Sequence, residues 1–120
     1  MAGAVDPLLA KLNEWYLNLG LDREKMELWG ILRGLADSHA RREVTEVELK
    51  AYVNELAEVV AAHLASAGKA VGVEEVADEL LKLVKQSSAS STYARYARIM
   101  ERLREARMKA AERREAGGIL

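Results

Sequence analysis

The sequence predicts an all-α protein, a compact bundle of about five helices whose C-terminal helix partly projects from the core. Three observations support this prediction. No window shows the sustained apolar and polar alternation of a strand that is bounded by turn residues. Apolar residues instead recur at spacings of three and four, which places them on one face of a helix. Most of these stretches also begin with a recognisable helix-start signal.

The first two expected helices carry clear end signals. Asp6 is a favourable N-cap residue, and Pro7 follows at the first helical position, where its missing N–H has no cost. Gly20 is expected to end this helix. The second helix contains Gly30 and Gly34, and each glycine costs about 1 kcal/mol relative to alanine in a helix interior. We therefore expect a neighbouring helix to approach closely at this pair. Three aromatic residues are expected in the core: Trp15, Tyr16 and Trp29.

The third helix has the best start signal in the chain. Thr45 and Glu48 have the sequence pattern of a capping box, in which the side chain of each residue accepts a hydrogen bond from the backbone N–H of the other. Gly68 is expected to end this helix. The fourth helix is expected to begin near Gly72 and to run to about Lys85.

A serine-rich segment separates the fourth helix from the last one. Serine side chains compete for backbone hydrogen bonds, so they favour a turn and a helix N-cap. The chain is therefore expected to form one domain with four parts. These are a four-helix core (residues 1–86), a serine-rich turn (87–91), a basic amphipathic helix (92–115) and a flexible tail (116–120).

The C-terminal helix differs from the rest of the chain in charge. Residues 92–115 hold eight Lys and Arg against four Glu, so this segment is +4, whereas the remainder is −5 and the whole chain −1. At 100° per residue, five of these cations fall within a sector of about 60°. With a tyrosine that could stack on a base, they form the candidate nucleic-acid site: Arg95, Arg98, Arg102, Lys109, Arg113 and Tyr96.

Two further stripes accompany the basic one. The apolar stripe consists of Tyr93, Tyr96, Met100 and Leu103. It ends at Leu103, so the first half of the helix is expected to dock on the core and the second half to project. An acidic stripe offers local ion pairs, which would leave a solvated helix that needs no ligand. The expected pairs are Arg98–Glu101, Arg102–Glu105 and Glu105–Lys109.

Two binding functions are consistent with these stripes. The leading hypothesis is a small non-catalytic subunit that contacts a nucleic-acid backbone with low sequence specificity. The serine-rich turn and the helix after it have the outline of a helix-turn-helix. The alternative is a protein–protein or self-assembly module, in which the projecting helix packs on a partner or a second copy. Its candidate interface residues are Leu103, Arg107, Met108, Ala110 and Ala111, with Ile119 and Leu120 in the tail.

Other functional classes have little support in the sequence. The chain has no Cys, and its two histidines, His39 and His63, lack the spacing of metal ligands. We therefore expect no metal, no cofactor, no small-molecule substrate and no enzymatic activity. No apolar run approaches the roughly 18 residues of a membrane span, and the N-terminus lacks a signal-peptide pattern. We expect a cytoplasmic protein with no membrane partner. The chain has few Asn and Gln residues, whereas 31% of its residues are charged. This composition is similar to that of thermophile proteins.

Overall fold

The computed structural model of the chain describes residues 6–90 and 92–117, and in the last helix the side chains of residues 95–114. This part of the chain forms five helices and no strand, which confirms the all-α prediction. The helices are α1 (Pro7–Trp15), α2 (Asp22–Ala40), α3 (Glu46–Ser66), α4 (Val73–Ala89) and α5 (Thr92–Gly117). Within the described residues, every helix is too short or too polar to cross a membrane.

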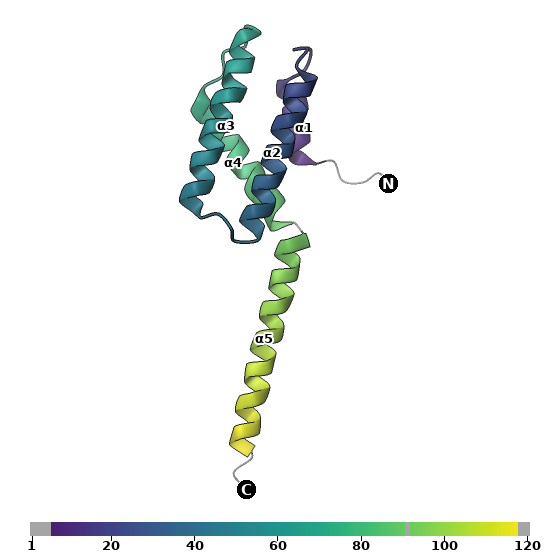
Figure 1. Cartoon of the computed structure of the whole chain (residues 1–120), viewed down its shortest axis with the longest axis vertical. Coiled ribbons are helices and arrows are strands. Elements are labelled where there is room, and N and C mark those ends of the chain that lie inside the picture. The colour runs from purple at the N-terminus through teal and green to yellow at the C-terminus, as the bar shows by residue number, and fades with distance from the viewer. Residues whose placement is uncertain (1–5, 91, 118–120) are drawn as a thin grey trace, which may run out of the picture.

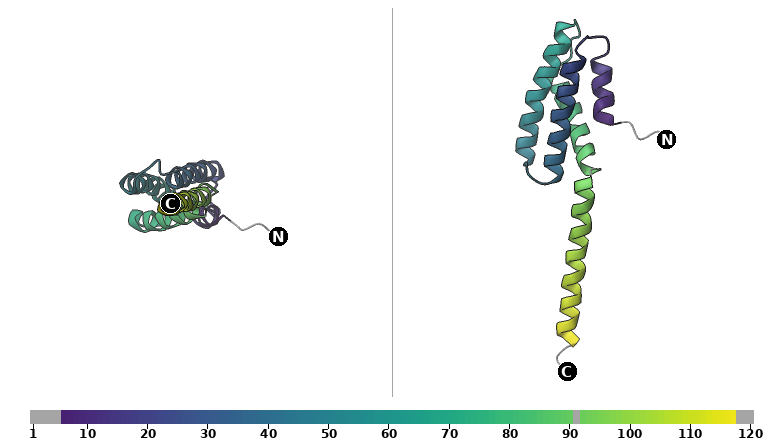
Figure 2. Two further views of the ribbon diagram at one scale, coloured as in Figure 1. Left: turned by 90° about the horizontal axis from the view of Figure 1, so that it is seen from below. Right: turned by 45° about the vertical axis from the view of Figure 1, so that its right-hand side comes forward.

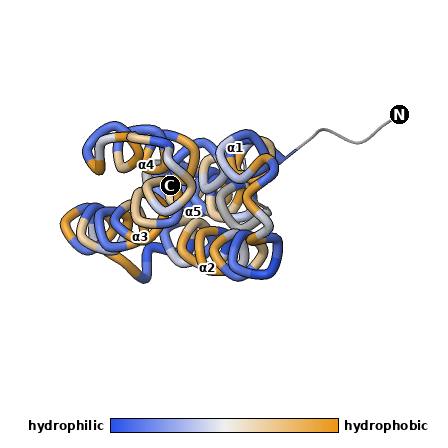
Figure 3. Tube along the Cα trace, turned by 90° about the horizontal axis from the view of Figure 1, so that it is seen from above, coloured by the Kyte–Doolittle hydropathy of each residue, from blue (hydrophilic) through white to orange (hydrophobic). Residues whose placement is uncertain are grey.

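The first four helices form a two-layered bundle. Figure 3 shows α1 and α4 in one layer and α2 and α3 in the other. Helix α4 is the central element, because α2 and α3 each pack mainly on it and little on one another. Leucine, valine and alanine side chains fill most of the core, and the chain contains no Phe. Its largest completely buried members include Leu12, Leu32, Leu49, Leu64 and Leu80.

The aromatic residues lie at the edge of this core. Tyr16 is buried, whereas Trp15 and Trp29 are partly buried and pack against the core. Tyr16 shares a 2.7 Å hydrogen bond between its hydroxyl and Nδ1 of His63. Burial and the nearby charge of Glu24 raise the pKa of Tyr16 to about 12, so its hydroxyl stays neutral.

The predicted helix starts are confirmed at two positions. Asp6 accepts a hydrogen bond from the backbone N–H of Leu8 at 2.9 Å and so caps α1. Thr45 and Glu48 form the full capping box. The backbone N–H of Glu48 donates to Oγ1 of Thr45 at 3.1 Å, and the backbone N–H of Thr45 donates to Oε1 of Glu48 at 2.9 Å. Helix α2 begins at Asp22, and its cap position is taken by Leu21 without a side-chain bond.

Helices α2 and α3 end in the same way but with different residues. Beyond α3, Gly68 has φ +80°, and the N–H of Lys69 bonds to the carbonyl of Leu64 at 2.8 Å. Beyond α2, Arg42 takes the equivalent position with φ +63°. This left-handed conformation usually belongs to glycine, because a Cβ atom makes it unfavourable. Sequence patterns gave no sign of this conformation at Arg42.

Two expectations about α2 and α4 are wrong. A Cβ atom added at Gly30 or Gly34 would meet nothing within 4 Å, so no described helix approaches closely at this pair. Helix α4 continues through Ser87 and Ser88 to Ala89, so the serine-rich turn does not begin at residue 87. Ser88 is buried and bonded to His39, and this contact favours helix over turn. Residue 91, at which a cap was expected, lies outside the described residues.

Helix α5 leads away from the bundle, as Figure 1 shows. The molecule measures 79 × 37 × 18 Å and has a radius of gyration of 20.4 Å. A compact domain of this length would have about 14 Å. Contact between α5 and the bundle involves α2 and α4, near their C-terminal ends. The helix therefore projects as predicted, and it continues through Ala116 to Gly117, where the tail was expected to begin.

Candidate nucleic-acid interface on helix α5

The predicted basic stripe lies on a helix whose described side chains are all exposed. Every described side chain of α5, from residue 95 to residue 114, is exposed. With 26 residues, the helix is about 39 Å long, since an α-helix rises 1.5 Å per residue. The basic stripe comprises Arg95, Arg98, Arg102, Lys109 and Arg113. It therefore presents its cations along most of the projecting rod.

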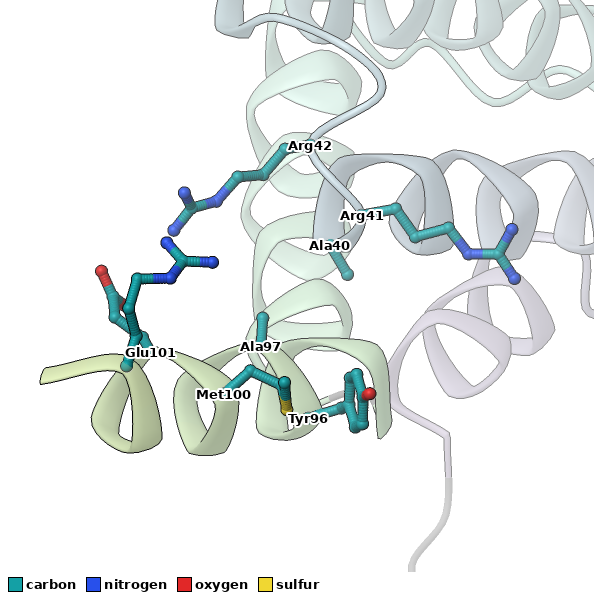
Figure 4. Close-up of a pocket in the computed structure, with 8 residues that line it drawn as sticks. Ala40, Arg41, Arg42, Tyr96, Ala97, Met100 and Glu101 are labelled. Carbon is teal, nitrogen blue, oxygen red and sulfur yellow. The ribbon is translucent and has the colours of Figure 1, made fainter. Parts of the chain in front are cut away.

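The first half of α5 docks less closely than we expected. Met100 is 37% exposed and Leu103 is 44% exposed, although both belong to the stripe that was expected to face the core. Ala97 lies at this contact, and Figure 4 shows its side chain directed toward Ala40 at the end of α2. The side chain of Tyr93 lies outside the described residues.

The ion pairs expected within α5 are not formed. No ion pair joins the basic and acidic stripes among the described side chains of this helix. Arg98 instead donates a long hydrogen bond of 3.4 Å from Nη1 to the carbonyl of Ala89 at the end of α4. The cations of the basic stripe are thus held by no ion pair to the acidic stripe, although Arg98 is partly engaged by the bundle.

A second row of cations lies on the other side of α5. On the helical wheel, Arg104, Arg107 and Arg114 lie roughly opposite the basic stripe, with Ala106 and Ala110 between the two rows. The two alanines line a shallow hollow with a volume of about 550 Å³, together with Lys109, Arg113 and Arg114. The projecting half therefore carries a narrow row of small side chains with cations on both flanks. Sequence reasoning missed this arrangement because it followed a single stripe.

A notch at the base of α5 is lined by further cations. This cavity of about 360 Å³ lies between the end of α2 and the start of α5. Figure 4 shows Arg42 extending toward the side chains on α5, where Arg104 also lines the cavity. Tyr96 is 62% exposed at its edge. Only the fold places the α2–α3 connection here, so the sequence gave no signal for Arg42.

The residues of the alternative interface do not form one surface. Leu103, Arg107 and Ala110 lie on one side of the wheel, whereas Met108 lies about 140° from Leu103. Met108 is nevertheless 58% exposed. Ile119 and Leu120 lie outside the described residues.

The histidines are held in hydrogen bonds within the bundle. His39 bonds to Ser88 through Nδ1 and to Glu46 through Nε2, at 2.8 and 3.0 Å. Glu46 also pairs with Lys85 at 2.9 Å, and the bonds from Lys85 and His39 lower the pKa of Glu46. Among the described residues, no three acidic or histidine side chains are grouped as a metal site would require.

Comparison of the chain with protein-family models, with curated proteins and with solved structures gives no significant match.

Proposed function

We propose that the protein is a small nucleic-acid-binding subunit that contacts the phosphate backbone through α5. The observation that carries this proposal is the exposed basic stripe, whose cations have no ion-pair partner among the described residues. Cations on a fixed rod replace the counterions that surround a nucleic acid, and the released counterions drive binding.

The second cation row supports binding in a groove. An α-helix fits the major groove of duplex DNA, where phosphates line both walls. Arg107 and Arg114 on one flank and Lys109 and Arg113 on the other would each face a wall. Ala106 and Ala110 between them are small enough to allow close approach.

Low sequence preference is supported by what α5 lacks. The described helix contains no Asn and no Gln, and Ala106 and Ala110, in the row that would face the base edges, carry no group that hydrogen-bonds to a base. The charge distribution also orients the molecule, because the segment of residues 92–115 is +4 and the remainder −5. We therefore expect α5 to meet the nucleic acid while the acidic bundle points away. The arrangement differs from a helix-turn-helix, since α5 leads away from α4 instead of packing across it.

Salt dependence tests this proposal. The variant Arg102→Gln/Lys109→Gln/Arg113→Gln removes three cations of the basic stripe, and the control Lys50→Gln/Lys69→Gln/Lys82→Gln removes three exposed cations of the bundle. Affinity for short duplex DNA and RNA would be measured by fluorescence anisotropy at about 50 and about 200 mM salt. We expect the stripe variant to lose about three units of the slope of log K against log salt.

Two results would overturn the proposal. One is an equal loss of affinity in both variants, since that would reflect net charge alone. The other is a wild-type affinity that does not depend on salt, because backbone contacts release counterions.

A further inference from the structure

An apolar groove runs between α2 and α3 on the outer face of their layer. Its volume is about 500 Å³, and Ile31, Gly34, Tyr52, Leu56 and Val59 line it. The exposed fractions are 54% for Ile31, 47% for Tyr52 and 43% for Val59. The apolar spacing in α3 predicts Tyr52 and Val59 for the core. They lie at this groove instead, because α2 and α3 pack on α4 more than on each other.

Gly34 gives the groove an open wall. A Cβ atom at this position would meet nothing within 4 Å. The glycine therefore weakens α2 by about 1 kcal/mol at an exposed position, without a compensating contact among the described residues. A helix that packs into the groove from outside would supply such a contact, because small residues allow helix backbones to approach closely.

Helix α5 carries an apolar surface of matching character. We define the α5 patch as Tyr96, Ile99, Met100 and Leu103, which are 62%, 58%, 37% and 44% exposed. Their spacing places them on one side of the helix. The patch and the groove of the same chain do not meet, because α5 leads away from the bundle at the ends of α2 and α4 (Figure 2).

The charges beside the two surfaces are complementary. Glu55 lines the groove. Glu27, which pairs with Arg23 at 3.9 Å, lies one turn from Ile31 on the same side of α2. On α5, Arg102 and Arg107 lie on either flank of Leu103. Cationic flanks around an apolar patch thus match acidic flanks around an apolar groove.

We propose that the α5 patch of one copy of this chain occupies the α2–α3 groove of a second copy. Amphipathic helices bind apolar grooves through side chains at this spacing. The two surfaces of the contact are different, so reciprocal exchange of α5 closes the assembly as a dimer and doubles the buried area. Most of the basic stripe lies outside the patch, but Arg102 and Arg107 border the patch, so the dimer and the proposed nucleic-acid contact share these two cations.

Two pairs of charge-neutral variants test the two sides of this contact. Gly34→Gln places a bulky polar side chain in the groove, and Gly30→Gln is its control one turn away, at a position that does not line the groove. Leu103→Gln removes the centre of the patch, and Met108→Gln is the control on another side of α5. Glutamine is a good helix former, so both glycine variants should fold at least as well as the wild type.

Sedimentation equilibrium would give the mass of each variant over a range of concentrations. We expect a wild-type dimer, at least about tenfold weaker association for Gly34→Gln and Leu103→Gln, and unchanged controls. A mixture of Gly34→Gln with Leu103→Gln should partly recover the dimer, because the intact patch of one meets the intact groove of the other. A monomeric wild type overturns the proposal. Small-angle X-ray scattering would then show either an extended chain with a free groove or a compact chain with α5 folded onto its own groove, and both results contradict the dimer. Loss of association in the controls also overturns it.

Discussion

His39 Nδ1 lies 2.8 Å from Oγ of Ser88, and this bond joins the last turn of α2 to the last turn of α4. The other ring nitrogen of His39 bonds to Oε1 of Glu46 at 3.0 Å. A carboxylate only accepts, so Nε2 donates; in a neutral ring Nδ1 then accepts, and the hydroxyl of Ser88 is the donor. The bond lies near the place where α5 leaves the bundle, since both residues line a cavity that α5 also borders.

Replacement of Ser88 by alanine should destabilise the bundle. Ser88 is 4% exposed, so its loss leaves a ring nitrogen without its donor in a partly buried place. We expect the free energy of unfolding, measured by urea denaturation, to fall by about 1–2 kcal/mol. Ser87→Ala is the matched control, because Ser87 is less buried, and it should leave stability within about 0.5 kcal/mol. Equal effects of the two variants would show that the bond to His39 contributes nothing specific.

Asp6 should make stability depend on acid pH. Burial alone would raise its pKa, but hydrogen bonds from Trp29, the Leu8 N–H and Arg33 outweigh burial and lower the pKa. The distances to Trp29 Nε1 and Arg33 Nη1 are 3.0 and 3.1 Å. A carboxyl with a lowered folded pKa stabilises the protein above its unfolded pKa of about 3.9, and this stabilisation is lost as pH falls through the folded pKa.

The variant Asp6→Asn isolates this contribution. Asparagine still caps a helix but cannot form the charged bonds, so we expect a loss of about 1–2 kcal/mol at pH 7. The difference from wild type should vanish at low pH, once the carboxyl of Asp6 is protonated. Urea titrations at several pH values would measure it, with Asp22→Asn as an exposed control. A difference that stays constant down to low pH would rule out the charge of Asp6 as the cause.

Arg42 and Gly68 should respond in opposite ways to substitution. Both have positive φ just beyond a helix end, and the conformation suits glycine better than arginine. Arg42→Gly should therefore raise stability by up to about 1 kcal/mol, and Gly68→Ala should lower it by about 1 kcal/mol. Thermal unfolding would measure both. A loss of stability in Arg42→Gly would mean that contacts of the arginine side chain outweigh the backbone strain.

Local chemistry explains what the sequence predicts well. Asp6, Thr45 and Glu48 act within three residues of their partners, so their roles can be recognised from the order of residues alone. Apolar spacing likewise identifies the helices, because it depends only on the helical repeat.

Tertiary contacts explain what the sequence predicts poorly. Ser88 is buried in the last turn of α4 and bonds to His39, which is distant in the sequence. Tyr52 and Val59 are exposed because α3 packs mainly on α4. The sequence of α3 alone does not indicate which helix it packs on. At the candidate site, the basic stripe follows from the sequence, whereas Arg42 joins it only through the position of a loop.

A chain that ends at Ser90 should keep the four-helix bundle and lose the functions assigned to α5. All described side chains of α5 are exposed, so removal of the helix takes little buried surface from the core. We expect denaturation of the shortened chain to show a stability within about 1 kcal/mol of the full chain. Anisotropy and sedimentation should show neither nucleic-acid binding nor a dimer. A shortened chain that unfolds would instead make the contact of Ala97 with the end of α2 part of the core, and retained binding would place the nucleic-acid surface on the bundle.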